Sequence, residues 1–141
     1  MNREEIKKIL PHREPMLLVD EAELEGDEFT GKYTVKGDEF FLNGHFPGNP
    51  IVPGVILCEM IAQSSAVLFK DEMTEDKLFV YTGINNVKFR GSVRPGDTVT
   101  FRGSLTRAKS PFYFIHGQAS VGDKKCVEGD FSFCMVDKPK E

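Results

Sequence analysis

The feature that most restricts how this chain folds is an oily segment in its middle, from Pro53 to Lys70. Its apolar positions fall on all sides of a helical axis, so a helix here must be covered by protein almost all round. Pro53 suits the first turn of such a helix, where its missing N–H costs nothing. The apolar positions are Val55, Ile56, Leu57, Met60, Ile61, Ala62, Ala66, Val67 and Leu68.

The segments on either side of this helix are typical of strands that can cover it. Residues 16–35 predict two strands with a turn at Gly26-Asp27, and residues 3–10 predict a short helix that Pro11 ends. Four runs rich in Val, Phe, Tyr and Thr follow, separated by turn residues: 78–91, 97–108, 112–122 and 124–137. An antiparallel sheet wrapped around one helix is an α+β architecture, and the chain of 141 residues, without repeat or linker, indicates a single domain, 1–141.

The composition narrows the class of protein. With 40% hydrophobic and 28% charged residues, the chain is typical of a soluble globular domain. The first residues hold no apolar run of signal-peptide length, and no stretch is apolar enough to span a membrane. We therefore expect a cytoplasmic protein with no membrane insertion. The three cysteines are odd in number and lack CxxC spacing, so reduced thiols are the simplest interpretation.

Charge is distributed unevenly along the chain. Residues 1–80 carry 8 basic and 16 acidic side chains, whereas residues 81–110 carry six basic side chains against one acidic side chain, Asp97. A basic segment in an acidic protein suggests a docking surface for an anionic partner, although solvated strand residues would give the same counts. The net charge of −4 and the lack of a nucleic-acid-binding motif argue against nucleic acid as that partner.

Glu59 places a carboxylate inside the oily helix, and Gln63 follows it at position i+4 on the same helix face. At this spacing the amide can hold the carboxylate. Burial in an apolar pocket disfavours the charged form of a carboxylate, which raises its pKa and suits it to proton transfer near neutral pH. The alternative is that Glu59 faces solvent or belongs to a structural network.

His45 lies just before the helix in the loop GHFPGNP, which Pro47 and Pro50 stiffen. Rigid loops beside a scaffold commonly hold catalytic groups, although a lone histidine is more often structural. His12 follows a proline near a helix end and His116 lies in a strand-like run, so both have weaker contexts. No two histidines have metal-ligand spacing, and we expect no metal site.

The start of the helix adds a third chemical element. The N–H groups of Gly54 and Val55 lie in the first turn, where a helix leaves N–H groups unpaired and its dipole is positive. Such groups can polarise a carbonyl oxygen or stabilise an enolate. Together with His45 and Glu59 they supply a base, an acid and oxyanion donors, which fits removal of a proton α to a carbonyl.

Four blocks of the sequence resemble, in order, one family of enzymes. They are LPHREPMLLVD, GHFPGNPIVPGVILCEMIAQ, GINNVKFRGSVRPGD and FSFCMVD, and they extend from Leu10 to Asp137. In these blocks the chain is similar to the bacterial 3-hydroxyacyl-[acyl-carrier-protein] dehydratases of fatty-acid synthesis, the FabZ group, with FabA as a close relative. Glu59 in place of an aspartate favours the FabZ side. Asn49 and Glu14 depart from the common pattern, at positions with no expected catalytic role.

The resemblance implies a hot-dog fold, in which an antiparallel sheet wraps around a long central helix, and a homodimer that assembles further into a hexamer. It implies that His45 of one protomer and Glu59 of the other form the catalytic pair. It also implies that Gly54 and Val55 bind the thioester carbonyl, and that Gln63 orients the acid. The implied reaction converts a (3R)-hydroxyacyl thioester on the phosphopantetheine arm of acyl carrier protein to a trans-2-enoyl thioester and water, with no metal or redox cofactor.

The resemblance also gives the basic segment a partner. Because acyl carrier protein is acidic, Lys88, Arg90 and Arg94 become candidates for its docking rim. Three alternatives use the same fold: a thioesterase that hydrolyses the thioester, an acyl-binding subunit without catalysis, and a dehydratase that also isomerises the trans-2 double bond to cis-3. The motifs leave the acyl chain length open.

Overall fold

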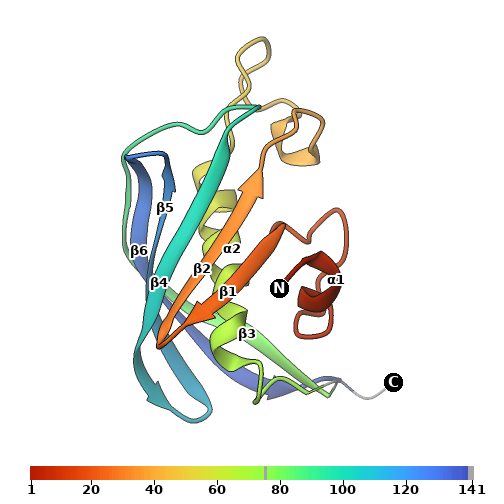
Figure 1. Ribbon diagram of the computed structural model, residues 1–141, viewed down its shortest axis with the longest axis vertical. Coiled ribbons are helices and arrows are strands. Elements are labelled where there is room, and N and C mark those ends of the chain that lie inside the picture. Colours follow the sequence, from red (N-terminus) through yellow and green to blue (C-terminus); the bar gives the residue numbers. More distant parts are fainter. Residues whose placement is uncertain (75, 140–141) are drawn as a thin grey trace.

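The computed structural model of the protein describes residues 1–74 and 76–139 (Figure 1). Six strands, two short 3-10 segments and two α-helices make up the described chain. Their bounds are α1 (Arg3–Ile6), β1 (Glu21–Glu25), β2 (Glu28–Thr34), η1 (Phe40–Leu42), α2 (Gly54–Ser64), η2 (Ser65–Phe69), β3 (Lys77–Phe89), β4 (Thr98–Lys109), β5 (Phe112–Val121) and β6 (Lys124–Asp137).

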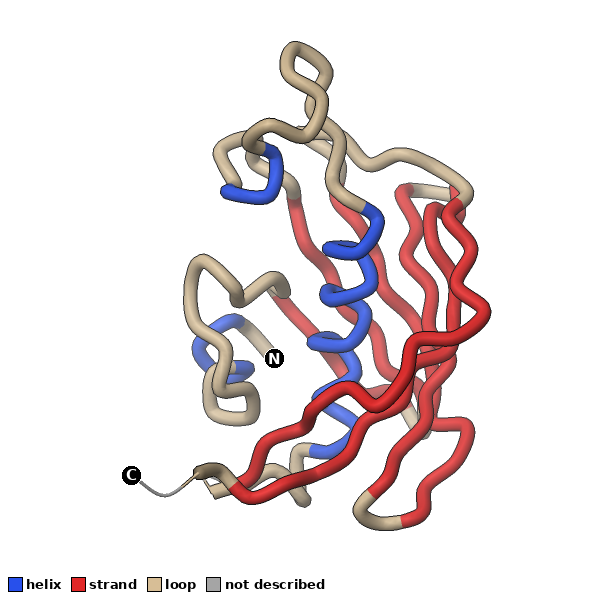
Figure 2. The backbone as a smooth tube through the Cα atoms, turned by 180° about the vertical axis from the view of Figure 1, so that it is seen from behind, coloured by secondary structure: helices blue, strands red, loops and turns tan. Residues whose placement is uncertain are grey.

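All six strands belong to one antiparallel sheet with the order β1-β2-β4-β5-β6-β3. The sheet curls around α2, which runs along one of its faces (Figures 1 and 2). β3 follows the helix in the chain but pairs with β6, so β1 and β3 are the two edges of the sheet. The predicted α+β arrangement, a sheet wrapped around one central helix, is confirmed.

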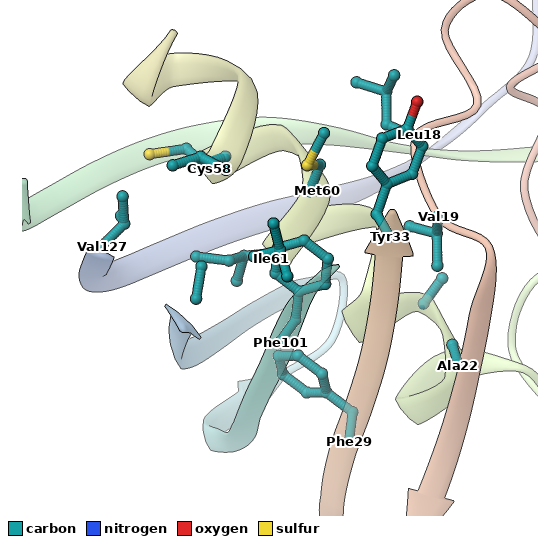
Figure 3. Packing of buried hydrophobic residues seen from close by; sticks show 14 of the residues in the cluster. Leu18, Val19, Ala22, Phe29, Tyr33, Cys58, Met60, Ile61, Phe101 and Val127 are labelled. Carbon is teal, nitrogen blue, oxygen red and sulfur yellow. The ribbon is translucent and has the colours of Figure 1, made fainter. Parts of the chain in front are cut away.

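The core lies between α2 and the sheet. Met60 and Ile61 of the helix are fully buried, as are Phe29 of β2 and Phe101 of β4, which lie across from them (Figure 3). Burying one side chain of this size contributes about 1.5–3 kcal/mol to folding. At Gly117 of β5 an added Cβ would overlap the Ile61 side chain, so the lack of a side chain there lets the helix approach the sheet closely.

The central helix is shorter and less covered than the sequence predicts. α-Helical geometry ends at Ser64, and the chain continues to Phe69 as the 3-10 segment η2. Ser64 donates its hydroxyl to the carbonyl of Met60, a side-chain bond that commonly bends or weakens a helix. Val55, in the first turn, is 70% exposed, so full coverage fails at this end. Among the described residues no helix has both the length and the apolarity to cross a membrane.

The N-terminal region contains less regular structure than predicted. α1 ends at Ile6 instead of Leu10, and β1 begins at Glu21 instead of Met16. Residues 17–19 are nevertheless buried, and their backbone groups bond to the side chains of Gln63 and Arg3 instead of to a neighbouring strand. The turn between β1 and β2 lies at the predicted Gly26-Asp27 position, where Gly26 has a positive φ of 63°.

His116 lies on the sheet face away from the core, between two carboxylates of the neighbouring strand. Its Nδ1 is 2.7 Å from Oδ1 of Asp130, and its Nε2 is 2.9 Å from Oε2 of Glu128. These two hydrogen bonds raise the pKa of His116 above its ordinary value. A histidine whose pKa is higher in the folded protein stabilises the fold when it is protonated. This stabilisation is complete below the pKa of the unfolded state, about 6.5, and disappears as pH rises through the pKa of the folded state.

We therefore expect the substitution His116→Gln to lower the free energy of unfolding by an amount that depends on pH. Wild type should exceed the variant in free energy of unfolding by more at pH 6 than at pH 9, because only the protonated ring gains from both carboxylates. Urea denaturation of both proteins at the two pH values measures this difference. A difference that stays constant between pH 6 and pH 9 would contradict the expectation.

Candidate active site

A cavity of ≈ 290 Å³ lies beside the central helix, walled by α2, η2, β3, β6 and the segment that follows α1. Four polar or ionisable side chains that contact one another form part of its lining: His12, Glu59, Gln63 and Tyr81. The other lining residues are apolar or small, namely Leu10, Pro11, Ala62, Ser65, Ala66, Phe69, Met73, Phe79, Val80 and Phe133. The cavity thus joins one polar cluster to an oily interior.

Three side chains from three different segments surround the Glu59 carboxylate. Gln63 donates its amide N–H to Oε2 at 2.9 Å, as the i+4 spacing predicts, and Tyr81 of β3 donates its hydroxyl to Oε1 at 3.1 Å. Nε2 of His12 lies 3.5 Å from Oε2. The Glu59 side chain remains 20% exposed, so Glu59 is neither a free surface residue nor sealed in the core.

The expectation that the pKa of Glu59 is raised is wrong. Burial alone does raise it, but the contacts with His12, Gln63 and Tyr81 favour the charged form more strongly, and the pKa of Glu59 lies below its ordinary value. The Tyr81 hydroxyl remains a donor, because burial and the neighbouring Glu59 charge raise its pKa above the usual range. The resting carboxylate is therefore an anion at neutral pH.

The side chain of Gln63 makes three hydrogen bonds in this region. It is only 3% exposed, and its Oε1 accepts the backbone N–H of Leu18 at 2.8 Å. Its Nε2 donates both to the carbonyl of Met16 at 2.8 Å and to Glu59. One amide therefore fastens the buried N-terminal segment to α2 and fixes the carboxylate on the preceding turn of the helix.

His45 lies in the loop that projects from one end of the molecule, after η1 (Figure 1). Its Nδ1 is 2.7 Å from the carbonyl of Ile51, so the neutral ring carries its hydrogen on Nδ1 and leaves the Nε2 lone pair free. Phe46 has a positive φ of 62°, a conformation that is uncommon for a bulky side chain and marks a tightly constrained turn. His45 is not among the described residues that line the Glu59 cavity.

The start of α2 is close to what the sequence predicts. The first N–H bonded to a carbonyl at this helix end is that of Ile56, to Pro53 at 2.9 Å, and no backbone acceptor is recorded for the N–H groups of Gly54 and Val55 among the described residues. The space next to the Gly54 Cα, however, is occupied: an added Cβ would overlap the ring of Phe89. Gly54 therefore permits close contact with Phe89 of β3, and not an open approach from that side.

The three basic docking candidates differ in whether their side chains are bonded to other residues. Lys88 lies near the end of β3 and Arg90 directly after it, and both are exposed. Arg94 instead donates its guanidinium to the side chain of Asn49 and so ties the His45 loop to residues 93–97. Lys124 packs its stem near Gly91 and adds a charge that the basic segment alone did not include.

Sequence reasoning missed two residues of the Glu59 cluster. Nothing in the local sequence of His12 indicates its contact with Glu59, 47 positions further along the chain. Tyr81 was assigned no role, although strand alternation could have indicated one: Phe79 and Tyr81 share a strand face, and both line the cavity. Long-range pairing decides both contacts.

Known proteins share this fold, and the chain matches one family of them. Residues 10–130 match the family model described as a FabA-like domain. The chain is 44% identical to the 3-hydroxyacyl-[acyl-carrier-protein] dehydratase FabZ of Macrococcus caseolyticus, covering 96% of this chain and 95% of the relative. It is 41% identical to the FabZ of Caulobacter sp. strain K31, covering 96% and 86%.

Solved structures with lower identity share the architecture. The dehydratase heterocomplex ApeI:P of Xenorhabdus doucetiae matches with a TM-score of 0.81 at 21% identity, covering 94% of this chain and 91% of that chain. A probable thioesterase of Bartonella henselae matches with a TM-score of 0.63 at 13% identity, covering 82% and 98%. At these identities the likeness concerns the fold.

The fold and the cluster around Glu59 together define a hot-dog protein with an ionisable site beside an oily cavity. The length of the family match and the identity to the curated relatives make the assignment more specific. The chain belongs to the FabA-like family and, within it, to the FabZ group of 3-hydroxyacyl-[acyl-carrier-protein] dehydratases.

The Gln63 network predicts a large stability cost for Gln63→Leu. The substitution leaves the buried N–H of Leu18 and the carbonyl of Met16 without their partner, which costs roughly 2–4 kcal/mol of unfolding free energy. Urea denaturation measures this loss. Gln118→Leu, at a half-buried strand position with no recorded side-chain hydrogen bond, is the matched control and should change stability by about 0.5 kcal/mol or less. Equal losses in the two variants would refute the role given to the amide.

Proposed function

We propose that the protein dehydrates (3R)-hydroxyacyl-[acyl-carrier-protein] to trans-2-enoyl-[acyl-carrier-protein] in type II fatty-acid biosynthesis. The observation that carries the proposal is the Glu59 carboxylate, fixed by hydrogen bonds at the wall of an apolar cavity of ≈ 290 Å³. A carboxylate can exchange a proton with a hydroxyl group, and the oily walls suit an acyl chain. Relatives about 40% identical over nearly the whole chain bear the name of this activity.

The first chemical step in this proposal is removal of the proton at C2. The thioester carbonyl oxygen accepts hydrogen bonds from the free N–H groups of Gly54 and Val55, which acidifies C2. Nε2 of His45 takes the proton, since Nδ1 is bonded to the Ile51 carbonyl and holds the ring in the required tautomer. The electron pair left on C2 becomes the new double bond to C3.

The second step is loss of the C3 hydroxyl as water. The C3–O bond breaks and the departing oxygen receives a proton from the Glu59 carboxyl, directly or through a water molecule. Because the lowered pKa favours the anion, Glu59 must first take up that proton, and the proton gained by His45 balances the one that Glu59 loses. In the reverse direction the Glu59 anion accepts a proton from water as its oxygen adds to C3.

We further propose that two copies of the chain complete the site. His45 does not line the Glu59 cavity of its own protomer, so a second protomer has to supply it. The edge strand β3 exposes Val80, Ile84 and Phe89, whereas the opposite edge, β1, carries alternating glutamates that repel a second copy. Pairing along β3 therefore fits a homodimer, and a hexamer of three such dimers is the larger assembly we propose.

The remaining elements of the proposal concern partners and location. Exposed Lys88 and Arg90, with Arg94 at the base of the His45 loop, suit docking of an acidic carrier protein whose phosphopantetheine arm delivers the substrate. The chemistry above uses side chains and backbone only and needs no metal or redox cofactor. We place the reaction in the cytoplasm, by analogy with other enzymes of fatty-acid synthesis.

Turnover of 3-hydroxybutyryl- and crotonyl-acyl-carrier-protein tests the activity. We expect wild type to interconvert them, and His45→Ala and Glu59→Gln each to lose on the order of 100-fold or more, the usual effect of a positioned acid or base. Absorbance of the conjugated thioester follows the reaction. His116→Gln, on the outer sheet face, is the matched histidine control and should retain activity.

A parallel assay for free thiol separates the dehydratase from a thioesterase. Thiol release without a change in the conjugated double bond would identify hydrolysis instead of dehydration. Wild type that binds the acyl carrier protein but turns over neither substrate would sink the proposed function.

Complementation tests whether the site is shared between protomers. Co-refolding His45→Ala with Glu59→Gln produces mixed dimers in which one of the two sites holds both native residues. A statistical mixture should then recover about a quarter of wild-type activity, although each variant alone is inactive. If both residues acted within one protomer, no mixed dimer would contain a complete site, and activity would stay at the level of the single variants.

A further inference from the structure

His12 reaches the active-site cavity on a segment that is fixed independently of Glu59. The guanidinium of Arg13 folds back onto this segment and donates to the carbonyls of Leu10 at 2.9 Å, His12 at 2.7 Å and Lys7 at 3.2 Å. The N–H of Met16 bonds to the carbonyl of Arg13 at 2.8 Å. The backbone that carries His12 is therefore held by contacts that do not involve the carboxylate.

The two ring nitrogens of His12 have different surroundings. Nε2 faces Oε2 of Glu59 at 3.5 Å, at the outer limit of a hydrogen bond. Nδ1 is fully buried and has no hydrogen-bond partner among the described residues. A hydrogen on Nδ1 would thus be a buried donor without an acceptor, which costs roughly 1–3 kcal/mol. The neutral ring therefore carries its hydrogen on Nε2, directed at the carboxylate.

The donors around Glu59 leave limited room for a substrate. A carboxylate offers about four acceptor positions: Gln63 and Tyr81 take two of them by hydrogen bonds, and His12 faces a third from 3.5 Å. The remaining position is available to a substrate hydroxyl or a water molecule. Three donors on three segments therefore set the direction in which Glu59 can act, and not only its charge.

His12 is also distinctive among the groups that control the charge of Glu59. The ionisable neighbours are His12 on the N-terminal segment, Tyr81 on β3 and the adjacent Cys58 on α2, while Gln63 on α2 is uncharged. Tyr81 stays neutral, and burial raises the pKa of the Cys58 thiol to about 11. Of the described residues that line the cavity, His12 alone can become a cation.

We propose that His12 is a positioning residue of this site, which holds Glu59 as an oriented anion through its Nε2–H and leaves one acceptor position of the carboxylate for the reacting oxygen. The inference rests on the proposed function for its kinetic consequences. The contact itself, between the N-terminal segment and the helix, does not depend on which thioester reaction the site performs.

Two substitutions of His12 test this role. His12→Met replaces the ring with an unbranched apolar side chain that has no N–H, whereas His12→Gln keeps an amide N–H near the position of Nε2. For hydration of crotonyl-acyl-carrier-protein, the direction in which the Glu59 anion accepts a proton, we expect His12→Met to move the acidic limb of the kcat/KM profile up by about one pH unit, because burial then outweighs the remaining donors. We also expect kcat at neutral pH to fall by about 10-fold with KM changed by less than about two-fold, and His12→Gln to restore most of both effects.

The carboxyl titration of Glu59 provides a readout that needs no turnover. In carbon-13 NMR, with the resonance assigned by its loss in Glu59→Gln, the Glu59 carboxyl should titrate at higher pH in His12→Met than in wild type. His12→Gln should titrate close to wild type. If wild type proves inactive while this titration still follows His12, the proposed function fails and the positioning role stands.

Arg13→Ala controls for a purely structural effect. It removes the Arg13 bonds but keeps the His12 side chain, and the bonds of Gln63 to Met16 and Leu18 still hold the segment against α2. It should therefore lower the melting temperature without moving the acidic limb or the Glu59 titration. Two results would overturn the proposal. One is a folded His12→Met protein whose acidic limb and carboxyl titration match wild type. The other is an Arg13→Ala protein that shifts both as far as His12→Met does.

Discussion

The buried amide of Gln63 is the interaction on which the rest of this structure depends. A helix wrapped on nearly all sides cannot carry unpaired polar groups, so the side chain that interrupts its oily surface must be satisfied completely. Gln63 achieves this with the backbone of Met16 and Leu18 and with Glu59. The same bonds keep the N-terminal segment against the helix, and that segment brings His12 to the cavity. The same hydrogen bonds therefore determine both the packing of the core and the geometry of the site.

Much of the architecture could be predicted because its causes are local. The apolar run after Pro53, the turn at Gly26-Asp27 and the Val- and Phe-rich runs each reflect a preference of nearby residues, and the helix and all six strands occur where these signals lie. Boundaries were less accurate where side chains compete with the backbone, as at Ser64. The lack of a helix or strand in residues 7–20 could not be predicted, because the hydrogen bonds that hold this segment are to partners distant in sequence.

In the candidate site, too, some contacts follow from the local sequence and others depend on residues distant in sequence. The pairing of Glu59 with Gln63 follows from helical spacing and could be read directly from the sequence. The charge of Glu59 could not, since the argument from an apolar environment omitted two donors that only the tertiary fold supplies, His12 and Tyr81. The sequence of one helix indicates the cost of burying a charge, but not the tertiary contacts that offset that cost. For a partly buried carboxylate those contacts decide the sign of the pKa shift.

The two unlike edges of the sheet have a consequence for how such a protein behaves in a cell. One edge, β1, carries exposed glutamates, and the other, β3, exposes apolar side chains and contacts the start of α2 through Phe89. In the dimer that we propose, the catalytic groups of a newly made chain meet only after it pairs with a second copy. Enzyme output would then rise more steeply than protein abundance at low expression, so the number of copies itself would act as a threshold for activity.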